Sequence, residues 1–306
     1  MLGGIGGLVG GTFLAGCSDD GLPGGADDPP PDEPSELPGS DVVTPERVAY
    51  GDDPSQYADL YRPAPGTDVD GQPSKGVVVV VHGGFWASAY DATLGAPLAL
   101  SLAEQGWTAW NLEYRRVGDG WGGGGGYPTT FDDVAAGIDA LADVDLTDAE
   151  RACVLTLGHS AGGHLATWAA ARGRYAPWSP VRVPVTGVVS QAGVLDLRAG
   201  LADPTARPNV LALMGGDDAA VDYAPADPAQ QVPLDVPVRC VHGRDDRIVP
   251  IGQSQAYVEA ALAAGADAEL VEVEGDHFVV IDETSDAWVA TLALLDGLRV
   301  ASGLPG

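Results

Sequence analysis

The stretch LTLGHSAGGHL, residues 155–165, places one serine in a glycine-rich turn with a histidine close on each side. A serine hydroxyl attacks a carbonyl carbon efficiently only when a base takes its proton. Gly158–Gly162 has the pattern G-x-S-x-G, and it follows a predicted strand and precedes an alanine-rich segment with helical periodicity. A sharp strand-to-helix turn of this kind projects a serine hydroxyl above a sheet. We therefore predict that Ser160 is the nucleophile of an acyl-transfer reaction.

Five histidines are candidates for the base. His159 is expected to point away from the serine hydroxyl, and His164 lies in the helix that follows. His82 and His242 end predicted strands, where a packing role is more usual. His277, in EGDHFVV, falls in the loop between the last predicted strand and the last predicted helix. That position completes the chain order serine, acid, histidine, so we expect His277 to be the base.

The carboxylate that orients the imidazole should lie between the serine and the histidine in the chain. The stretch HGRDDRIVP follows the predicted strand PVRCV and offers Asp245 and Asp246. Either aspartate can be the acid, and the other would then cap the turn.

Two glycines follow a run of five valines in GVVVVVHGG. Because glycine has no side chain, its backbone N–H group can approach a developing negative charge closely. We expect Gly83 and Gly84 to provide such oxyanion donors, together with the N–H of Ala161, the residue after the nucleophile. Phe85 and Trp86 come next and are candidates for substrate binding, although Trp86 is equally a candidate for the core.

The elements that must position these residues alternate between strands and helices. Helical periodicity is found near residues 91–105, 131–141, 160–171, 253–263 and 285–298. Two extended pieces lie near 47–51 and 57–62, and short strands near 76–84, 108–112, 153–157, 185–190, 238–241 and 269–273. Such alternation predicts an α/β fold: a mostly parallel, doubly wound sheet with helices on both faces. Functional groups in these sheets gather at the carboxyl ends of the strands, where every motif above is located.

The chain is strongly acidic, with a formal net charge of −29, and Lys75 is its one lysine. Such a surface repels nucleic acid and anionic lipid headgroups, which excludes both as partners of the folded domain. A salt-loving host and an ordinary acidic secreted protein explain this composition equally well. Cys153 and Cys240 lie in apolar runs and are expected to pack in the core. No spacing typical of metal ligands is present, and no cofactor is implied.

Residues 1–17 are predicted to be a lipoprotein-type export signal, because they form a short apolar run that ends in Leu14-Ala15-Gly16-Cys17. That tetrad resembles the lipobox of lipoproteins, in which the cysteine is lipidated. Residues 18–45 are rich in Asp, Pro and Gly and have little apolar surface to bury, which predicts a disordered tether. The catalytic domain, residues 46–306, is therefore expected outside the cytoplasm, lipid-anchored to the outer face of the cell membrane.

Two other features have structural explanations. The stretch GDGWGGGGGYP contains G-x-G-x-x-G but does not open a helix directly, so it does not indicate a dinucleotide site. We expect it to form a flexible rim of the active site. Arg115 and Arg116 could bind substrate, but an arginine that pairs with Asp132 or Asp133 to anchor this loop is the better explanation.

Taken in order, these motifs resemble the α/β-hydrolases of the esterase and lipase group, and most closely the branch of feruloyl-esterase-like domains and kynurenine formamidases (arylformamidases). The resemblance extends over roughly residues 50 to 288 and is carried by HGGFW, NLEYRR, YPTTFDDV, GHSAGGHLATW, HGRDDRIVP and GDHF. It implies Ser160, Asp246 and His277 as a catalytic triad, since D-x-x-V-P resembles an acid-bearing turn of the superfamily. It also implies oxyanion donors at Gly83, Gly84 and Ala161. Phe85 stands where many lipases have a further glycine.

The expected reaction is hydrolysis of a short-acyl or aryl carboxylic ester through an acyl-enzyme, since the segment between residues 194 and 236 has room only for a small lid. The same machinery would serve an arylformamidase that cleaves an aryl amide. A non-catalytic surface-binding lipoprotein that has kept the fold is a third possibility. The expected partner is a small-molecule ester or aryl amide, and a membrane is involved only through the lipid anchor.

Overall fold

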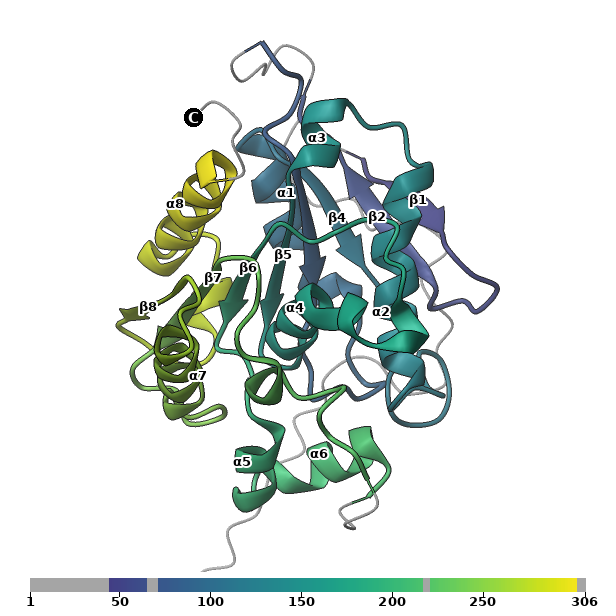
Figure 1. Cartoon of the computed structure of the whole chain (residues 1–306). Coiled ribbons are helices and arrows are strands. Elements are labelled where there is room, and N and C mark those ends of the chain that lie inside the picture. Colours follow the sequence, from purple (N-terminus) through teal and green to yellow (C-terminus); the bar gives the residue numbers. More distant parts are fainter. Residues whose placement is uncertain (1–43, 65–70, 217–220, 302–306) are drawn as a thin grey trace, which may run out of the picture.

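A computed structural model describes residues 44–64, 71–216 and 221–301. Within these ranges eight strands form one sheet, in the order β1-β2-β4-β3-β5-β6-β7-β8 (Figure 1). The strands are β1 (Glu46–Ala49), β2 (Tyr57–Tyr61), β3 (Val77–Val81), β4 (Thr108–Leu112), β5 (Val154–His159), β6 (Gly187–Gln191), β7 (Val238–Gly243) and β8 (Ala268–Val273). The pairings β1–β2 and β2–β4 are antiparallel, and the six strands from β4 to β8 in the sheet order run parallel to one another. The predicted α/β fold class is therefore confirmed.

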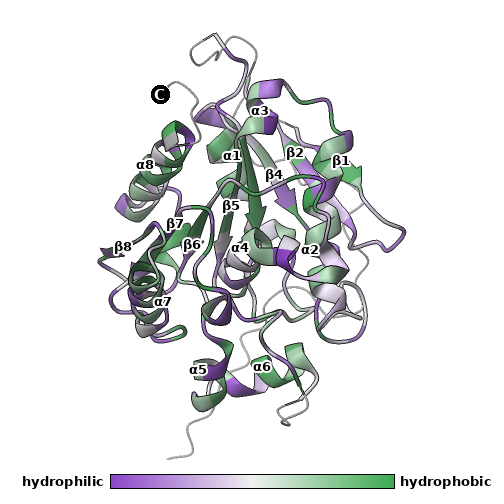
Figure 2. Cartoon of the chain, viewed as in Figure 1, coloured by the Kyte–Doolittle hydropathy of each residue, from purple (hydrophilic) through white to green (hydrophobic). Residues whose placement is uncertain are grey.

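Strand β3 shows why the sheet is buried on both faces. Its five valines are all buried, and they contribute alternately to two apolar layers. Val77, Val79 and Val81 pack toward the layer that contains α2 and α4, whereas Val78 and Val80 pack toward the layer that contains α1 and α8. The alternation follows from the two-residue period of a strand. Figure 2 shows the strands of the sheet centre as the most hydrophobic part of the chain.

Helices cover both faces of the sheet (Figure 1). They are α1 (Ala96–Glu104), α2 (Thr129–Asp139), α3 (Asp148–Ala152), α4 (Ala161–Ala171), α5 (Leu197–Ala202), α6 (Arg207–Met214), α7 (Gly252–Ala263) and α8 (Asp286–Ala301). One apolar layer is formed with α2, α4 and α7, and the other with α1 and α8. The five helices predicted from periodicity are all present, with boundaries that shift by a few residues. Cys153 and Cys240 are buried, as expected for small core residues.

Three short helices were not predicted. Helix α3 begins with a capping box, in which the Thr147 hydroxyl accepts the N–H of Glu150 while the Glu150 carboxylate accepts the N–H of Thr147. Helices α5 and α6 lie in the segment between β6 and β7, below the sheet in Figure 1. They are too short to show a clear helical period in the sequence.

The predicted signal, the lipidation candidate Cys17 and nearly all of the predicted tether lie outside the described residues. Among the helices that the structure does describe, none combines the length and the apolar character needed to cross a bilayer.

Candidate active site

Ser160 stands at a strained turn between β5 and α4. Its backbone has φ 55° and ψ −119°, a conformation rare for a residue with a side chain, and the residue is almost completely buried. A side chain at Gly158 would collide with the carbonyl of Gly162, and one at Gly162 would collide with the carbonyl of Val81. The two glycines are therefore required so that helix α4 can start directly beneath β3. This geometry matches the strand–turn–helix context predicted for a nucleophile.

Asp246 and His277 form a short hydrogen bond. Nδ1 of His277 lies 2.6 Å from Oδ2 of Asp246, and because a carboxylate only accepts, this nitrogen carries the proton. The other carboxylate oxygen accepts the backbone N–H groups of Ile248 (2.8 Å) and Val249 (2.9 Å). Of the two candidate aspartates, the structure thus pairs Asp246 with the histidine, whereas Asp245 is exposed.

The electrostatics of Asp246 keep it ionised. Burial alone would raise the pKa of its carboxyl group, but hydrogen bonds from His242 and His277 outweigh burial and hold this pKa well below its usual range. A permanent carboxylate at Nδ1 leaves Nε2 of His277 as the acceptor of a proton, which is the tautomer that a general base needs.

His277 lies beside the residue that precedes the serine. The Nε2–H of His159 donates to the carbonyl oxygen of His277 at 2.9 Å, and the two ring centroids are 4.5 Å apart. Sequence reasoning expected His159 to point away from the serine hydroxyl, and its contact with His277 was not foreseen. Burial lowers the pKa of His159 to about 3, so it is neutral at physiological pH and is not a base.

The loop after β3 bends around the nucleophile. Gly84, Phe85 and Trp86 all have positive φ (106°, 57° and 55°), so the chain turns in a left-handed sense there. A Cβ at Gly83 would lie 2.8 Å from the carbonyl oxygen of His159 and 3.2 Å from Cβ of Ser160. The glycine therefore allows the backbone to approach the serine closely, as an oxyanion hole requires.

Ala161 is the first residue of α4 and is almost fully buried. The first N–H groups of a helix have no partner within the helix and carry the positive end of its dipole. Ala161 is thus placed to donate to an oxyanion above Ser160.

A buried polar cluster packs against the loop that contains Gly83 and Gly84. Oε1 of Glu113 lies 3.2 Å from Nε2 of His82 and forms an ion pair with Arg116, while Oε2 accepts the N–H of Ala92 at 2.9 Å. The His82 ring stacks on Tyr114, with 4.5 Å between the centroids. Burial lowers the pKa of His82 to about 3, which excludes it as a base. Sequence reasoning missed the role of Glu113, although it lies in the NLEYRR motif.

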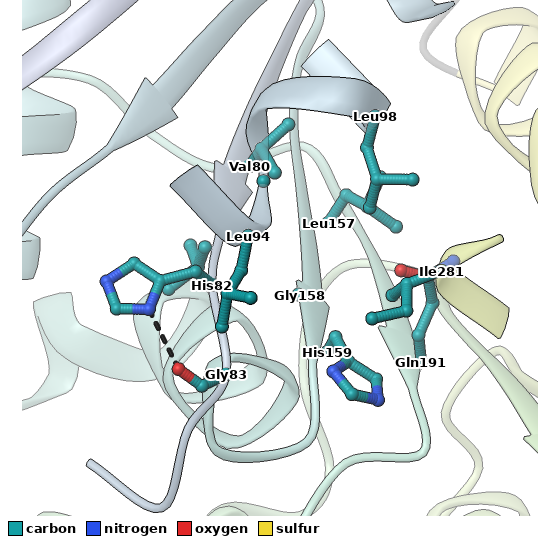
Figure 3. Close-up of a pocket in the computed structure, with 12 residues that line it drawn as sticks. Val80, His82, Gly83, Leu94, Leu98, Leu157, Gly158, His159, Gln191 and Ile281 are labelled. Atoms are coloured by element: carbon teal, nitrogen blue, oxygen red, sulfur yellow. Dashed lines mark hydrogen bonds between the residues drawn. The ribbon is translucent and has the colours of Figure 1, made fainter. Parts of the chain in front are cut away.

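Figure 3 shows the carboxyl ends of β3 and β5 in close-up. His82 turns away from His159 and contacts the carbonyl of its neighbour Gly83 at 2.8 Å. The space between these strand ends and α1 is a cavity of about 10 Å³, enclosed largely by apolar side chains such as Leu98 and Leu157.

Side-chain packing also bears on the predictions for Trp86 and for Arg115 and Arg116. Trp86 is a core residue: its side chain is buried, and its indole N–H donates to Nδ1 of His164 at 3.2 Å. The packing therefore favours the core alternative for Trp86, whereas Phe85 is half-buried and stays a candidate for substrate binding. Arg115 pairs with Asp133 at 2.7 Å, as predicted for a loop anchor. Arg116 does not, because its ion pair is with Glu113.

Over the described ranges, no group of three or more His, Cys, Asp or Glu side chains is arranged to hold a metal ion.

Comparison with known proteins places this site in a family. A family model named BD-FAE matches residues 59–261. Esterase LipC of Mycobacterium tuberculosis is 29% identical over 230 residues, and the isoprenylcysteine alpha-carbonyl methylesterase ICME of Arabidopsis thaliana is 28% identical over 251. These matches cover 71% and 74% of this chain but 55% of each relative, so the chain spans about half the length of these curated relatives.

Solved structures with the same fold include esterase B of Lactobacillus Rhamnosis (TM-score 0.71, 24% identity, 85% of this chain and 86% of that one). Another is esterase Est2 of Thermogutta terrifontis (TM-score 0.65, 24% identity, 85% of this chain and 92% of that one). These likenesses concern the fold alone. Because the family model covers well over half of the sequence, from β2 to α7, the chain belongs to the BD-FAE family.

Proposed function

We propose that this protein is a serine hydrolase that cleaves carboxylic esters of short-acyl or aryl type through an acyl-enzyme. The observation that carries the proposal is the paired Asp246 and His277 beside the strained turn of Ser160. Membership of the BD-FAE family and similarity to proteins named as esterases support it. A solved neighbour of the same fold is named as inhibited by a tributyrin phosphonate, a reagent type that fits a nucleophilic serine.

The proposed reaction uses Ser160, the Asp246–His277 pair and the backbone donors. Nε2 of His277 takes the proton of Ser160 as Oγ bonds to the carbonyl carbon, and the carbonyl oxygen becomes an oxyanion held by backbone N–H groups of the Gly83–Gly84 loop and Ala161. His277 then gives the proton to the leaving alcohol oxygen as the ester bond breaks. A water molecule then attacks the acyl carbon while His277 takes its proton. His277 returns this proton to Oγ of Ser160 as the acyl–serine bond breaks and the acid is released.

A hollow beside the site fits a short chain or a single ring. It measures about 210 Å³ and is lined mainly by apolar side chains between α5 and the start of α7, among them Val194, Val249 and Ala256. Two of its lining residues bond directly to the proposed triad: Val194 donates its N–H to the carbonyl of Ser160 at 3.3 Å, and Val249 donates its N–H to Asp246. An apolar cavity of about 150 Å³ accepts benzene.

The decisive experiment is labelling with a fluorophosphonate, which modifies activated serines. We expect one adduct at Ser160 in the wild type and none in Ser160→Ala. A folded wild type that forms no adduct would favour the alternative of a non-catalytic binding lipoprotein and remove the proposal.

The alternative reaction, hydrolysis of an N-formyl aryl amide, uses the same groups. We expect kcat/KM for p-nitrophenyl acetate to exceed that for N-formylkynurenine. A preference for the formamide by about a hundredfold, equivalent to about 2.7 kcal/mol, would reverse the ranking and make the protein an arylformamidase.

We further propose that the protein is exported and anchored by a lipid on Cys17. The support is the tetrad Leu14-Ala15-Gly16-Cys17 after an apolar run. Radiolabelled palmitate should be incorporated into the wild type and not into Cys17→Ala expressed in the same host. Equal incorporation in both would contradict the anchor.

A further inference from the structure

A second histidine binds the carboxylate that orients His277. Nε2 of His242 lies 3.2 Å from Oδ2 of Asp246, the same oxygen that accepts from His277. His242 is fully buried at the end of β7, and its other ring nitrogen lies 2.8 Å from Oγ of Ser254 on α7. A chain of contacts thus runs from Ser254 through His242 and Asp246 to His277.

The partners of His242 define its tautomer. Its Nε2 also lies 2.9 Å from the backbone carbonyl of Val249, which can only accept a hydrogen bond. Both neighbours of Nε2 are therefore acceptors, and Nε2 must carry the proton. The remaining nitrogen, Nδ1, accepts from the hydroxyl of Ser254. The single Nε2–H of His242 is thus shared between the Val249 carbonyl, at 2.9 Å, and the Asp246 carboxylate, at 3.2 Å, and Ser254 fixes the orientation of the ring.

This donor completes the hydrogen bonding of Asp246. Oδ1 is held by two backbone N–H groups, and Oδ2 by His277 on one side and His242 on the other. Without His242, Oδ2 would have a single partner, and the carboxylate could rotate about its own axis away from the line to His277. Sharing its charge with a second donor also weakens the pull of Oδ2 on the imidazolium that forms during the reaction.

We propose that His242 is a positioning residue for ester hydrolysis: its Nε2–H fixes Asp246 in line with His277 and moderates the basicity of His277. The inference rests on the proposed function. It differs from a purely structural role, in which His242 would only tie β7 to the following turn through the Val249 carbonyl. A structural role predicts lost stability, whereas a positioning role predicts a change in kcat and in the pH profile.

The test compares His242→Leu, which removes the donor, with His242→Gln, whose amide can still donate to Oδ2. With p-nitrophenyl acetate we expect kcat of His242→Leu to fall by about 10–100-fold, with KM within about twofold of wild type. The acid limb of kcat/KM should move to higher pH by about half a unit, because Oδ2 then pulls more strongly on protonated His277. His242→Gln should recover kcat to within about fivefold of wild type.

The other titratable groups near this pair are the same in all variants. They are His159, Cys240, Glu272 and Tyr257. His159 packs on His277, and Glu272 lies opposite His242 in the register of β7 and β8. Burial raises the pKa of Cys240 to about 12, and it also raises the pKa of Tyr257 on α7. A shift of the acid limb is therefore assigned to the altered Asp246–His277 pair.

Val241→Ala is the matched control for stability. Val241 is the neighbouring residue of β7, fully buried, and packs in the opposite layer with α8. It should lower the Tm while the pH profile stays unchanged. The proposal is overturned if His242→Leu keeps wild-type kcat, or if its activity falls only as far as its folded fraction with an unmoved acid limb. It is also overturned if folded His242→Gln is as slow as His242→Leu. Fluorophosphonate labelling of the wild type, measured first, separates these results from a failure of the proposed function.

Discussion

His159 and His277 lie ring against ring, with their centroids 4.5 Å apart, and the Nε2–H of His159 holds the carbonyl oxygen of His277. The residue before the nucleophile therefore holds the loop that carries the proposed base. Because His159 is buried and neutral, it can pack against His277 without repelling the imidazolium that forms during the reaction.

His159→Leu should lower kcat/KM for p-nitrophenyl acetate by about tenfold, since the loop loses the bond that fixes the depth of His277. His159→Gln can still donate to the carbonyl of His277 and should retain most of the activity. Steady-state kinetics of the two variants checks this. Equal activities, both close to wild type, would show that the contact is only packing.

Asp246→Asn should reduce kcat by about 10⁴-fold, because an amide in this position disfavours the tautomer of His277 that accepts the proton of Ser160. Asp245→Asn is the control, since the Asp245 side chain is exposed and does not contact His277. Its kcat should stay within about twofold of wild type. A large loss in Asp245→Asn with an active Asp246→Asn would exchange the two assignments.

Gly83→Ala should cost about 3–4 kcal/mol of transition-state stabilisation, or about 10²–10³ in kcat. The added methyl group would press on the carbonyl of His159 and on Ser160, and would push the donor loop away from the oxyanion. Gly297→Ala, on α8 and away from the hollow, is the matched control, because nothing lies within 4 Å of the new Cβ. Similar kcat values for the two variants would contradict the assignment of the loop.

Ala256→Trp should fill the hollow beside the site. We expect kcat/KM for p-nitrophenyl butyrate to fall at least about tenfold more than for the acetate, because the longer chain needs the space that the indole occupies. Ala260→Trp, one turn further along α7 and exposed, should leave the ratio of the two esters unchanged. An unchanged ratio in Ala256→Trp would place the acyl chain elsewhere.

Stability should fall steeply below pH 6.5. Burial lowers the pKa values of His82 and His159 to about 3 and that of His164 to about 4, from 6.5. The unfolded chain therefore binds more protons than the folded one below pH 6.5, and folding loses about 1.4 kcal/mol per pH unit for each of the three histidines. The loss continues until the folded pKa values are reached.

Urea unfolding at pH 7, 6 and 5 measures this slope above the range in which most carboxylates titrate. His164→Gln should be less stable at pH 7 but should show a slope about one third smaller. A free energy of unfolding that stays constant from pH 7 to pH 5 would show that these histidines are protonated in the folded protein.

The fold and the Asp246–His277 pair could be predicted because their signals are local in the sequence. Five valines, a G-x-S-x-G turn and an aspartate after a strand each define their own backbone setting, and the parallel sheet brings the strand ends together. The supporting contacts have no such signal. Glu113 and His242 are ordinary residues in the sequence, and their roles depend on which carboxylate or imidazole lies 3 Å away in space. The sequence around Trp86 likewise does not show whether its indole packs in the core or lines a pocket.

The buried indole of Trp86 has a mechanical consequence. Its N–H joins the loop that carries the oxyanion donors to His164, one turn along the helix that begins after Ser160. Near the start of the same helix, Gly162 packs directly against the carbonyls of Val81 and His82 at the end of β3. The proposed nucleophile and the proposed oxyanion donors are thus joined through direct contacts between α4 and the loop after β3, so we expect a displacement of α4 to move both together. We therefore expect the distance between the serine oxygen and the proposed backbone donors to stay constant when other parts of the protein move.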